Sequence, residues 1–248
     1  QEGELIAEFG EKRRLLLDYA QIPQTAINAF VAAEDAAFFS HPGIDPIGLL
    51  RAAFKLITTG TRQQGGSTIT MQAARNFYLR RDKTYLRQLY EIFLAWRIES
   101  ELSKQDILAL YLNKIYLGQR AYGIGAAAYA YYGKPLEQLN LAQTATLAGL
   151  PKAPSRYNPL ANPERALIRR NYVLRQMLSL DMIRQADYDQ ALAAPVSARR
   201  YKPPVQVEAP YVAEMVRAHL FEQYGEAAYT SGYEVYTTIQ ARDQAAAN

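Results

Sequence analysis

A mainly α-helical fold is predicted by three features of the sequence. Apolar residues recur at three- and four-residue spacing in several segments, hydrophobic residues make up 49% of the chain against 21% charged residues, and glycine is spread thinly. Two stretches predict short β segments near the termini. Apolar and polar residues alternate weakly from Glu4 to Leu17, and β-branched and aromatic residues are frequent from Gly232 to Ile239. At 248 residues the chain can bury a full core, as one large domain or as one domain with a small appendage.

The individual helices are predicted from residues that favour a helix start and from apolar residues at three- and four-residue spacing. Pro23 opens the first clear helix, and Ser103 is placed to cap a later one. The predicted helical segments are 23–34, 47–57, 83–101, 103–113, 163–177 and 211–224. One stripe of the long segment 83–101 consists of Leu86, Leu89, Phe93 and Trp96.

Composition excludes several kinds of chemistry. The chain has no cysteine, so thiol catalysis, disulfides and cysteine-ligated metals are excluded, and its two histidines leave no imidazole-rich metal site. Any metal site would need carboxylates. The net charge of +4 is modest for a nucleic-acid-binding protein, and nucleic acid is not an expected partner.

Basic residues gather in two segments. The first cluster consists of Arg75, Arg80, Arg81, Lys83 and Arg87. The second cluster, placed on the outer face of segment 163–177, consists of Arg165, Arg169, Arg170 and Arg175. The first is expected to bind an anion. The second is interpreted as a solvated helix face, with contact to anionic lipid headgroups as the alternative.

The sequence begins at Gln1, and no uncharged apolar run approaches the ~20 residues that a membrane span needs. We therefore interpret the chain as part of a longer protein from which any targeting or anchoring segment has been removed.

Glu34 is the residue we expect to act as a base. It follows Ile27, Phe30 and Val31 and precedes Phe38, so its carboxylate should be partly desolvated. Desolvation raises the pKa of a carboxylate toward the range in which it can accept a proton at neutral pH. The alternative is a helix end whose acids face water.

An anion site is predicted where Gly65-Gly66-Ser67-Thr68 enters a helix. Free backbone N–H groups, hydroxyl donors and the positive end of a helix dipole together favour a phosphate. An ordinary loop with an N-cap is the alternative. The G-x-x-x-x-G-K pattern is missing, so this is not a nucleotide P-loop.

The segment from Leu49 to Ile57 is unusually apolar, with five large hydrophobic residues. Such a segment is interpreted as core, with an apolar lip that touches a bilayer or a lipid tail as the alternative.

Two ordered motifs resemble a known family. Glu34-Asp35-x-x-Phe38-x-x-His41-x-Gly43, followed by the stretch from Gly65 to Gln72, resembles the first two motifs of the peptidoglycan glycosyltransferases. These enzymes form glycosyltransferase family 51, and occur in class A penicillin-binding proteins and as monofunctional transglycosylases.

The remaining motifs of this family follow in order. Arg87 to Glu91 resembles the third, except that Gln88 replaces the family's lysine, which puts one positive substrate contact in doubt. Ser103 to Gly118 resembles the fourth motif, and Ala148 to Pro159 the fifth. The resemblance extends from about Gly3 to about Ala194.

The resemblance implies a lysozyme-like helical glycosyltransferase domain with a small membrane-facing jaw subdomain. Residues 1–198 would form this domain, and residues 199–248 a linker and the start of the connection to a transpeptidase domain. The chain contains neither S-x-x-K nor K-T-G, so the serine nucleophile of a transpeptidase is not in it.

The implied reaction polymerises lipid II into glycan strands and inverts the anomeric centre. Glu34 would be the base and Glu91 the second essential carboxylate, whereas Asp35 and His41 would mainly serve local structure. The residues assigned to the substrate diphosphate are Ser67, Thr68, Gln72, Arg75, Lys83 and Arg87. Glu91 could orient the basic residues, hold a divalent cation such as Mg²⁺ at the diphosphate, or stabilise oxocarbenium-like charge. No cofactor follows with certainty.

The implied partners are lipid II, the growing glycan strand and the outer leaflet of the bacterial cytoplasmic membrane, at the periplasmic face of which the parent protein would be anchored by an N-terminal helix. Two other readings remain open. One is a lysozyme-like hydrolase or lytic transglycosylase, which would have no use for a diphosphate site. The other is a non-enzymatic helical module that binds partners or anionic membranes through its basic faces.

Overall fold

The computed structural model describes residues 4–7, 9, 13–46, 48, 58, 67–78, 85–201 and 207–248. They belong to two compact units, one of Arg14–Arg200 and one made from both ends of the chain, Gln1–Arg13 with Tyr201–Asn248. The boundary that the sequence predicts between residues 198 and 199, and the roles expected on either side of it, stay predictions.

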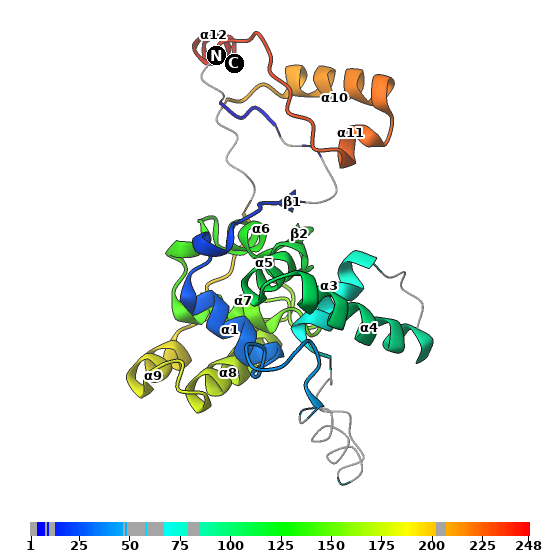
Figure 1. The fold of residues 1–248 in the computed structure, drawn as a ribbon. Coiled ribbons are helices and arrows are strands. Elements are labelled where there is room, and N and C mark those ends of the chain that lie inside the picture. Colours follow the sequence, from blue (N-terminus) through cyan, green and yellow to red (C-terminus); the bar gives the residue numbers. More distant parts are fainter. Residues whose placement is uncertain are drawn as a thin grey trace. The chain divides into compact units, whose positions relative to one another are not determined.

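Helices make up most of the larger unit (Figure 1). They are α1 (Gln24–Glu34), α3 (Ile69–Tyr78), α4 (Tyr85–Glu101), α5 (Lys104–Lys114), α6 (Ile124–Tyr132), α7 (Leu141–Gly149), α8 (Pro163–Ser179) and α9 (Gln185–Ala193), with short 3₁₀ turns η1 (Tyr19–Gln21) and η2 (Leu136–Gln138). The two-residue strands β1 (Arg13–Arg14) and β2 (Ala121–Tyr122) pair with each other. The predicted mainly α-helical class is confirmed.

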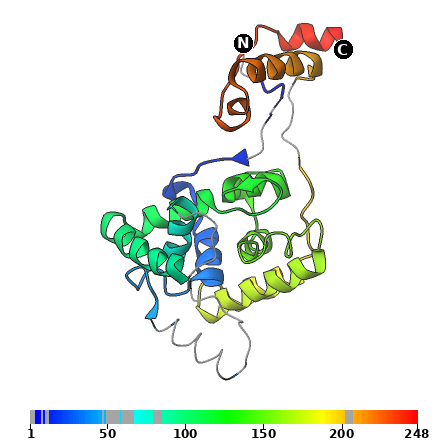
Figure 2. The same ribbon diagram turned by 90° about the vertical axis from the view of Figure 1, so that its right-hand side faces the viewer.

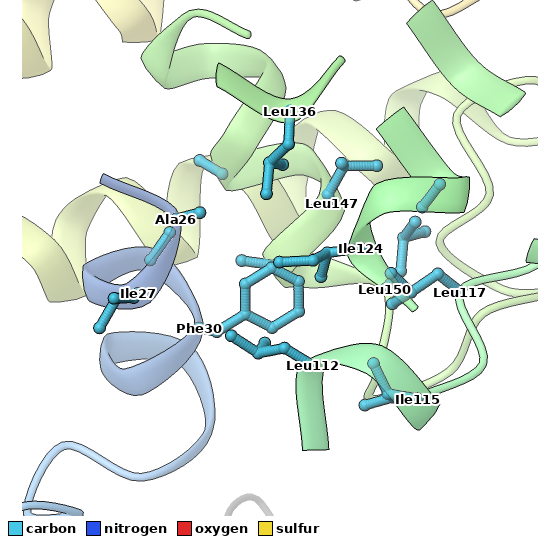
Figure 3. Packing of buried hydrophobic residues seen from close by; sticks show 14 of the residues in the cluster. Ala26, Ile27, Phe30, Leu112, Ile115, Leu117, Ile124, Leu136, Leu147 and Leu150 are labelled. Atoms are coloured by element: carbon cyan, nitrogen blue, oxygen red, sulfur yellow. The ribbon is translucent and has the colours of Figure 1, made fainter. Parts of the chain in front are cut away.

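The core surrounds α1. Phe30 is fully buried and lies among Leu112 of α5, Ile124 of α6 and Leu147 of α7 (Figure 3). Figure 2 shows α3, α4 and α5 on one side of α1, and α7 and α8 on the other. Burying a large apolar side chain stabilises the fold by about 1.5–3 kcal/mol. The C-terminal end of α1, where Glu34 lies, is therefore held by packing from both sides.

Most predicted helices are confirmed, with shifts of one or two residues at their ends. Ser103 accepts a hydrogen bond from the Asp106 N–H and caps α5, as expected. Phe93 and Trp96 of α4 are each 65% exposed, so this part of the predicted stripe is not a buried face. The helix predicted at 47–57, with its apolar segment from Leu49, lies outside the described residues.

The placement of all four α8 arginines on an outer face is wrong for two of them. Arg165 and Arg175 are exposed, but Arg169 and Arg170 are buried. The guanidinium of Arg170 donates to the backbone oxygens of Leu192 and Ala194, which replaces the water it loses. Arg169 extends toward Glu34.

The smaller unit contains α10 (Pro210–Tyr224), α11 (Ala227–Thr230) and α12 (Ala241–Ala247). The strand predicted from Gly232 to Ile239 is not formed; among the described residues this stretch has no strand partner. Its residues have the right composition, with Val235 and Tyr236 exposed. A strand, however, also needs a neighbour for its backbone N–H and C=O groups.

Candidate active site

Glu34 is the last residue of α1, because Asp35 leaves the helical backbone conformation. The Glu34 side chain is only 12% exposed. One carboxylate oxygen, Oε2, accepts a hydrogen bond from Gln72 Nε2 at 3.1 Å, and the other, Oε1, lies 3.5 Å from Arg169 Nη2. Burial raises the pKa of Glu34, and the hydrogen bond from Gln72 and the positive charges of Arg169 and Lys152 oppose part of that rise. The alternative of a helix-end acid that faces water does not describe this residue.

Tyr111 fixes the orientation of Gln72. Its hydroxyl donates to Gln72 Oε1 at 3.3 Å, which leaves the amide NH₂ to face Glu34. Tyr111 is fully buried, and burial raises the pKa of its phenol well above the usual value. The phenol therefore stays protonated and remains a hydrogen-bond donor throughout the neutral pH range.

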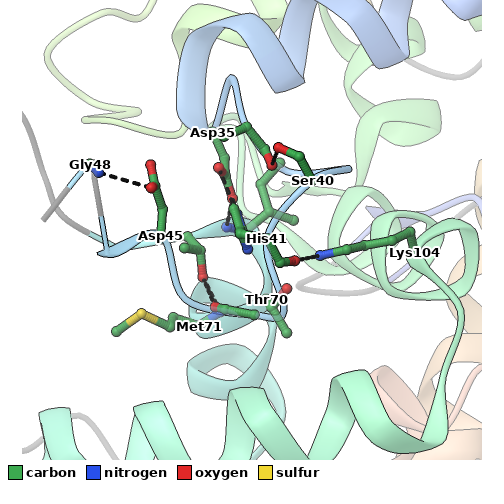
Figure 4. A network of polar contacts seen from close by, with 12 residues as sticks. Asp35, Ser40, His41, Asp45, Gly48, Thr70, Met71 and Lys104 are labelled. Atoms are coloured by element: carbon green, nitrogen blue, oxygen red, sulfur yellow. Dashed lines mark hydrogen bonds and ion pairs between the residues drawn. The ribbon is translucent and has the colours of Figure 1, made fainter.

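The start of α3 is tied to the turn that follows α1. Asp35 Oδ2 accepts the backbone N–H of Ile69 at 2.9 Å, and both Asp35 oxygens lie 3.0 Å from His41 Nε2. Figure 4 shows Asp35 and His41 pointing toward each other, with Lys104 donating to the backbone oxygen of His41. Asp35 and His41 thus order the local structure, as expected.

Two backbone N–H groups at the start of α3 are engaged within the protein. Asp35 takes the Ile69 N–H, and the Thr68 hydroxyl accepts the Met71 N–H while donating to the Gly43 oxygen at 2.6 Å. Backbone donors used within the protein are not available to a phosphate. Gly65 and Gly66 lie outside the described residues, so the anion site expected at this helix start stays a prediction.

Arg75 and Glu91 form the second part of the site. Arg75 Nε and Nη2 donate to the two Glu91 oxygens at 2.9 and 2.7 Å, and Nη2 also donates to Ser67 Oγ at 3.1 Å. Glu91 is fully buried, whereas the Arg75 side chain is 38% exposed. The buried carboxylate therefore holds a cation whose outer edge remains open to an anion.

One helix connects the two parts. Gln72 and Arg75 are three residues apart on α3, so they share a face about 4.5 Å apart along the helix axis. Gln72 contacts Glu34 and Arg75 contacts Glu91. α3 thus carries both the donor that contacts the candidate base and the candidate anion-binding cation.

The structure brings together Glu34, Ser67, Gln72, Arg75 and Glu91 of the predicted site. Thr68 is buried with its hydroxyl engaged, and its substrate contact stays a prediction. Lys83 lies outside the described residues, as does the side chain of Arg87. Their roles stay predictions as well.

Three residues near Glu34 were not assigned from the sequence: Tyr111, Lys152 and Arg169. Tyr111 and Lys152 lie within the stretches that resemble the fourth and fifth motifs, so membership of these motifs could have indicated them as site residues. Arg169 is three residues after buried Ala166 and four before buried Val173. This spacing is compatible with the buried face of α8, but the carboxylate that compensates a buried charge here, Glu34, lies 135 residues earlier.

The chain belongs to the family described as Transglycosylase, whose model matches residues 2–178 and so includes every residue named at this site. The resemblance inferred from the five motifs is thereby confirmed. Among individual proteins, the chain is 53% identical to penicillin-binding protein 1A of Vibrio cholerae, covering 100% of this chain and 30% of the relative. It is 50% identical to penicillin-binding protein 1A of Escherichia coli K12, covering 99% of this chain and 29% of the relative.

A solved structure has the same fold. The crystal structure of penicillin-binding protein 1A from Haemophilus influenzae covers 98% of this chain with 36% identity and a TM-score of 0.55, and the match spans 27% of that protein. The chain therefore spans less than a third of the length of the relatives that it matches.

Proposed function

We propose that this chain polymerises lipid II into peptidoglycan glycan strands. The 4-hydroxyl of the acceptor disaccharide attacks the anomeric carbon of a growing strand, and undecaprenyl diphosphate leaves from the opposite face. The configuration is inverted. The single observation that carries the proposal is the arrangement of two α3 side chains. Gln72 donates to buried Glu34, and Arg75, three residues further along the same helix, is a partly exposed cation held by Glu91.

Proton removal is the role of Glu34 in this proposal. A sugar hydroxyl is a weak nucleophile at neutral pH, and a positioned base contributes ~10² to 10⁴ in rate. Burial raises the pKa of Glu34, which makes it a stronger base than an exposed carboxylate, while the hydrogen bond from Gln72 opposes part of that rise. Gln72 also fixes its orientation.

Stabilisation of the departing diphosphate is the role of Arg75. Glu91 and Ser67 hold its guanidinium before substrate arrives, so little reorganisation accompanies the development of charge. A preorganised charge of this kind is often worth several kcal/mol in the transition state. Of the three roles considered for Glu91, this geometry supports orientation of a basic residue.

A divalent cation at the diphosphate stays a proposal. Among the described residues no group of three or more His, Asp or Glu side chains is arranged to hold a metal ion. Both Glu91 oxygens accept hydrogen bonds from Arg75. A cation at this place would take its ligands chiefly from the substrate, and no step above depends on it.

The proposal extends to the setting of the reaction. Because the undecaprenyl tail stays in a bilayer, the domain would work at the outer face of the cytoplasmic membrane, with a lysozyme-like body and a small membrane-facing jaw. The apolar segment from Leu49 to Ile57 is the candidate for contact with the outer leaflet. None of the helices in the described part of the chain is long and apolar enough to cross a membrane. The relatives' remaining length would hold the transpeptidase part, since this chain lacks its motifs.

Glu34→Gln tests the proposal directly. The variant keeps the size and hydrogen-bonding reach of the side chain but cannot accept the proton, so consumption of fluorescent lipid II should fall by ~10² or more. Lipid vesicle binding and circular dichroism serve as controls for membrane contact and folding. Wild-type turnover by the variant would defeat the assignment.

Cleavage of glycan is the rival activity, favoured by the raised pKa of Glu34, which also suits a general acid. Incubating the protein with purified, undecorated glycan distinguishes glycan cleavage from lipid II polymerisation. The proposal expects no soluble fragments, and their release together with no consumption of lipid II would replace it.

A further inference from the structure

Arg169 is a buried cation at Glu34 that neither the motifs nor the proposed function uses. It comes from α8, is 6% exposed, and brings Nη2 to 3.5 Å from Glu34 Oε1. The two residues are 135 positions apart in the sequence. Arg75 and Glu91, by contrast, form the separate pair on α3 and α4.

Several contacts hold the Arg169 guanidinium in place. Its Nε donates to the Gly149 oxygen at 3.3 Å, and its central carbon lies 4.5 Å from the centre of the Tyr172 ring. A Cβ at Gly149 would lie only 2.8 Å from Arg169 Cγ, so the missing side chain makes room for the arginine stem. These contacts fix the position of the Arg169 side chain within the folded protein.

The groups that face Glu34 come from five elements. They are Asp35 after α1, Gln72 of α3, Tyr111 of α5, Lys152 after α7 and Arg169 of α8. Of the two cations, Arg169 is the one whose guanidinium lies within ion-pair distance of the carboxylate in the described residues. Burial makes a lone carboxylate costly to ionise, and a nearby fixed cation offsets that cost.

The two Glu34 oxygens are held differently. Gln72 makes a hydrogen bond of ordinary length to Oε2, whereas the 3.5 Å contact between Arg169 and Oε1 is too long for a strong hydrogen bond. Coulombic attraction falls off slowly with distance, so Arg169 still favours the charged form. Oε1 therefore keeps lone-pair capacity for an incoming proton.

We propose that Arg169 is a positioning residue for proton transfer, which holds the Glu34 carboxylate ionised and presents Oε1 as the proton-accepting oxygen. This inference rests on the proposed function. In that step the acceptor 4-hydroxyl oxygen forms a bond to the anomeric carbon and its proton passes to Oε1. The bond from the anomeric carbon to phosphate oxygen breaks, and the diphosphate leaves with the electron pair.

Two substitutions separate charge from shape. Arg169→Met removes the charge and keeps much of the stem, whereas Arg169→Lys keeps the charge. With the cation gone, the pKa of Glu34 rises further, so the acid limb of the kcat profile should move to higher pH by about one unit. At neutral pH kcat should fall about tenfold with KM for lipid II within twofold. Arg169→Lys should recover at least half of the shift.

Arg184→Met is the matched control, because Arg184 is a surface arginine of the same unit with an 84% exposed side chain. It should leave the pH profile unchanged. A folded Arg169→Met variant with the wild-type acid limb would overturn the proposal, as would a loss of activity that is uniform across pH.

A direct titration keeps this inference separate from the proposed function. Carbon-13 NMR of the Glu34 carboxyl in the whole chain reports its ionisation without any substrate. The titration midpoint should be higher in Arg169→Met than in wild type, and Arg169→Lys gives the same comparison if the methionine variant does not fold. Unchanged midpoints refute the role of Arg169. Failure of the wild-type chain to consume lipid II would instead refute the proposed function.

Discussion

Arg75 and Glu91 form a bidentate ion pair in which the carboxylate is fully buried and the guanidinium is partly exposed to solvent. The pair spans α3 and α4, and the same guanidinium reaches Ser67 at the start of the helix. Such a carboxylate acts by fixing a cation, because no face of it is left for solvent.

Glu91→Gln should therefore damage activity more than stability. The amide can accept from only one Arg75 donor and loses the charge, so we expect turnover to fall about 10²-fold. Because Arg75 is partly exposed and can be solvated, the free energy of unfolding should fall by only about 1 kcal/mol. Lipid II turnover and urea denaturation measure the two effects.

The control lies on the same helix. Glu101 pairs with Arg97 at 3.0 Å, but both side chains are more than 60% exposed. Glu101→Gln should change the free energy of unfolding by only a few tenths of a kcal/mol and leave turnover intact. Equal losses in the two variants would show that Glu91 has no special part.

Gln72→Glu would put a second carboxylate against Glu34. Repulsion between like charges raises the pKa of one of the pair, so the acid limb of turnover should move to higher pH by about one unit or more. Gln72→Met, which only removes the donated hydrogen bond, should give a smaller shift in the same direction. A pH profile of lipid II consumption distinguishes them, and a profile that moves to lower pH would contradict the contact.

Glu34→Gln should also change how stability depends on pH. Burial raises the folded-state pKa of Glu34 above its ordinary value of 4.5, so the folded protein binds this proton more tightly than the unfolded chain. The stabilisation that comes from this tighter proton binding is complete below pH 4.5, and it is lost as the pH rises through the folded-state pKa of Glu34. Glutamine has no such loss. The Tm of Glu34→Gln relative to wild type should therefore rise over this window and then level off.

Calorimetry between pH 4 and pH 8 checks that expectation. Glu137→Gln, which alters an exposed carboxylate of η2, is the control and should keep a constant Tm difference across the range. A difference for Glu34→Gln that falls with increasing pH would contradict the raised pKa.

Gly149→Ala should disturb Glu34 from a distance. The added Cβ would lie 2.8 Å from Arg169 Cγ, so the arginine must move or the helices must separate. Overpacking of this kind costs about 1–3 kcal/mol. If Arg169 positions Glu34, the variant should also show the acid-limb shift expected of Arg169→Met.

Gly125→Ala offers a comparable clash elsewhere, with its Cβ 2.9 Å from the Leu15 backbone oxygen. It should lower the Tm without moving the acid limb. A shift of the limb in both variants would point to a general loosening of the fold rather than to Arg169.

Local signals predicted the parts of this protein that depend on neighbours in the sequence. The cap at Ser103 and the burial of Glu34 behind Phe30 follow from residues a few positions away. For Arg169, one of four clustered arginines, the sequence predicts a solvated face, because arginine side chains are mostly exposed. Its burial depends on a carboxylate 135 residues earlier and on the space beside Gly149. The strand predicted around Val235 is not formed for the same reason, because strand pairing depends on a segment that is distant in the sequence.

Because Gln72 and Arg75 extend from the same helix, a tilt or slide of α3 would displace the donor that orients Glu34 together with the cation that binds the leaving group. A one-residue insertion between them would rotate Arg75 by about 100° about the axis and separate the two tasks. Over evolutionary time, substitutions should therefore be accepted at this helix far more readily than changes in its length.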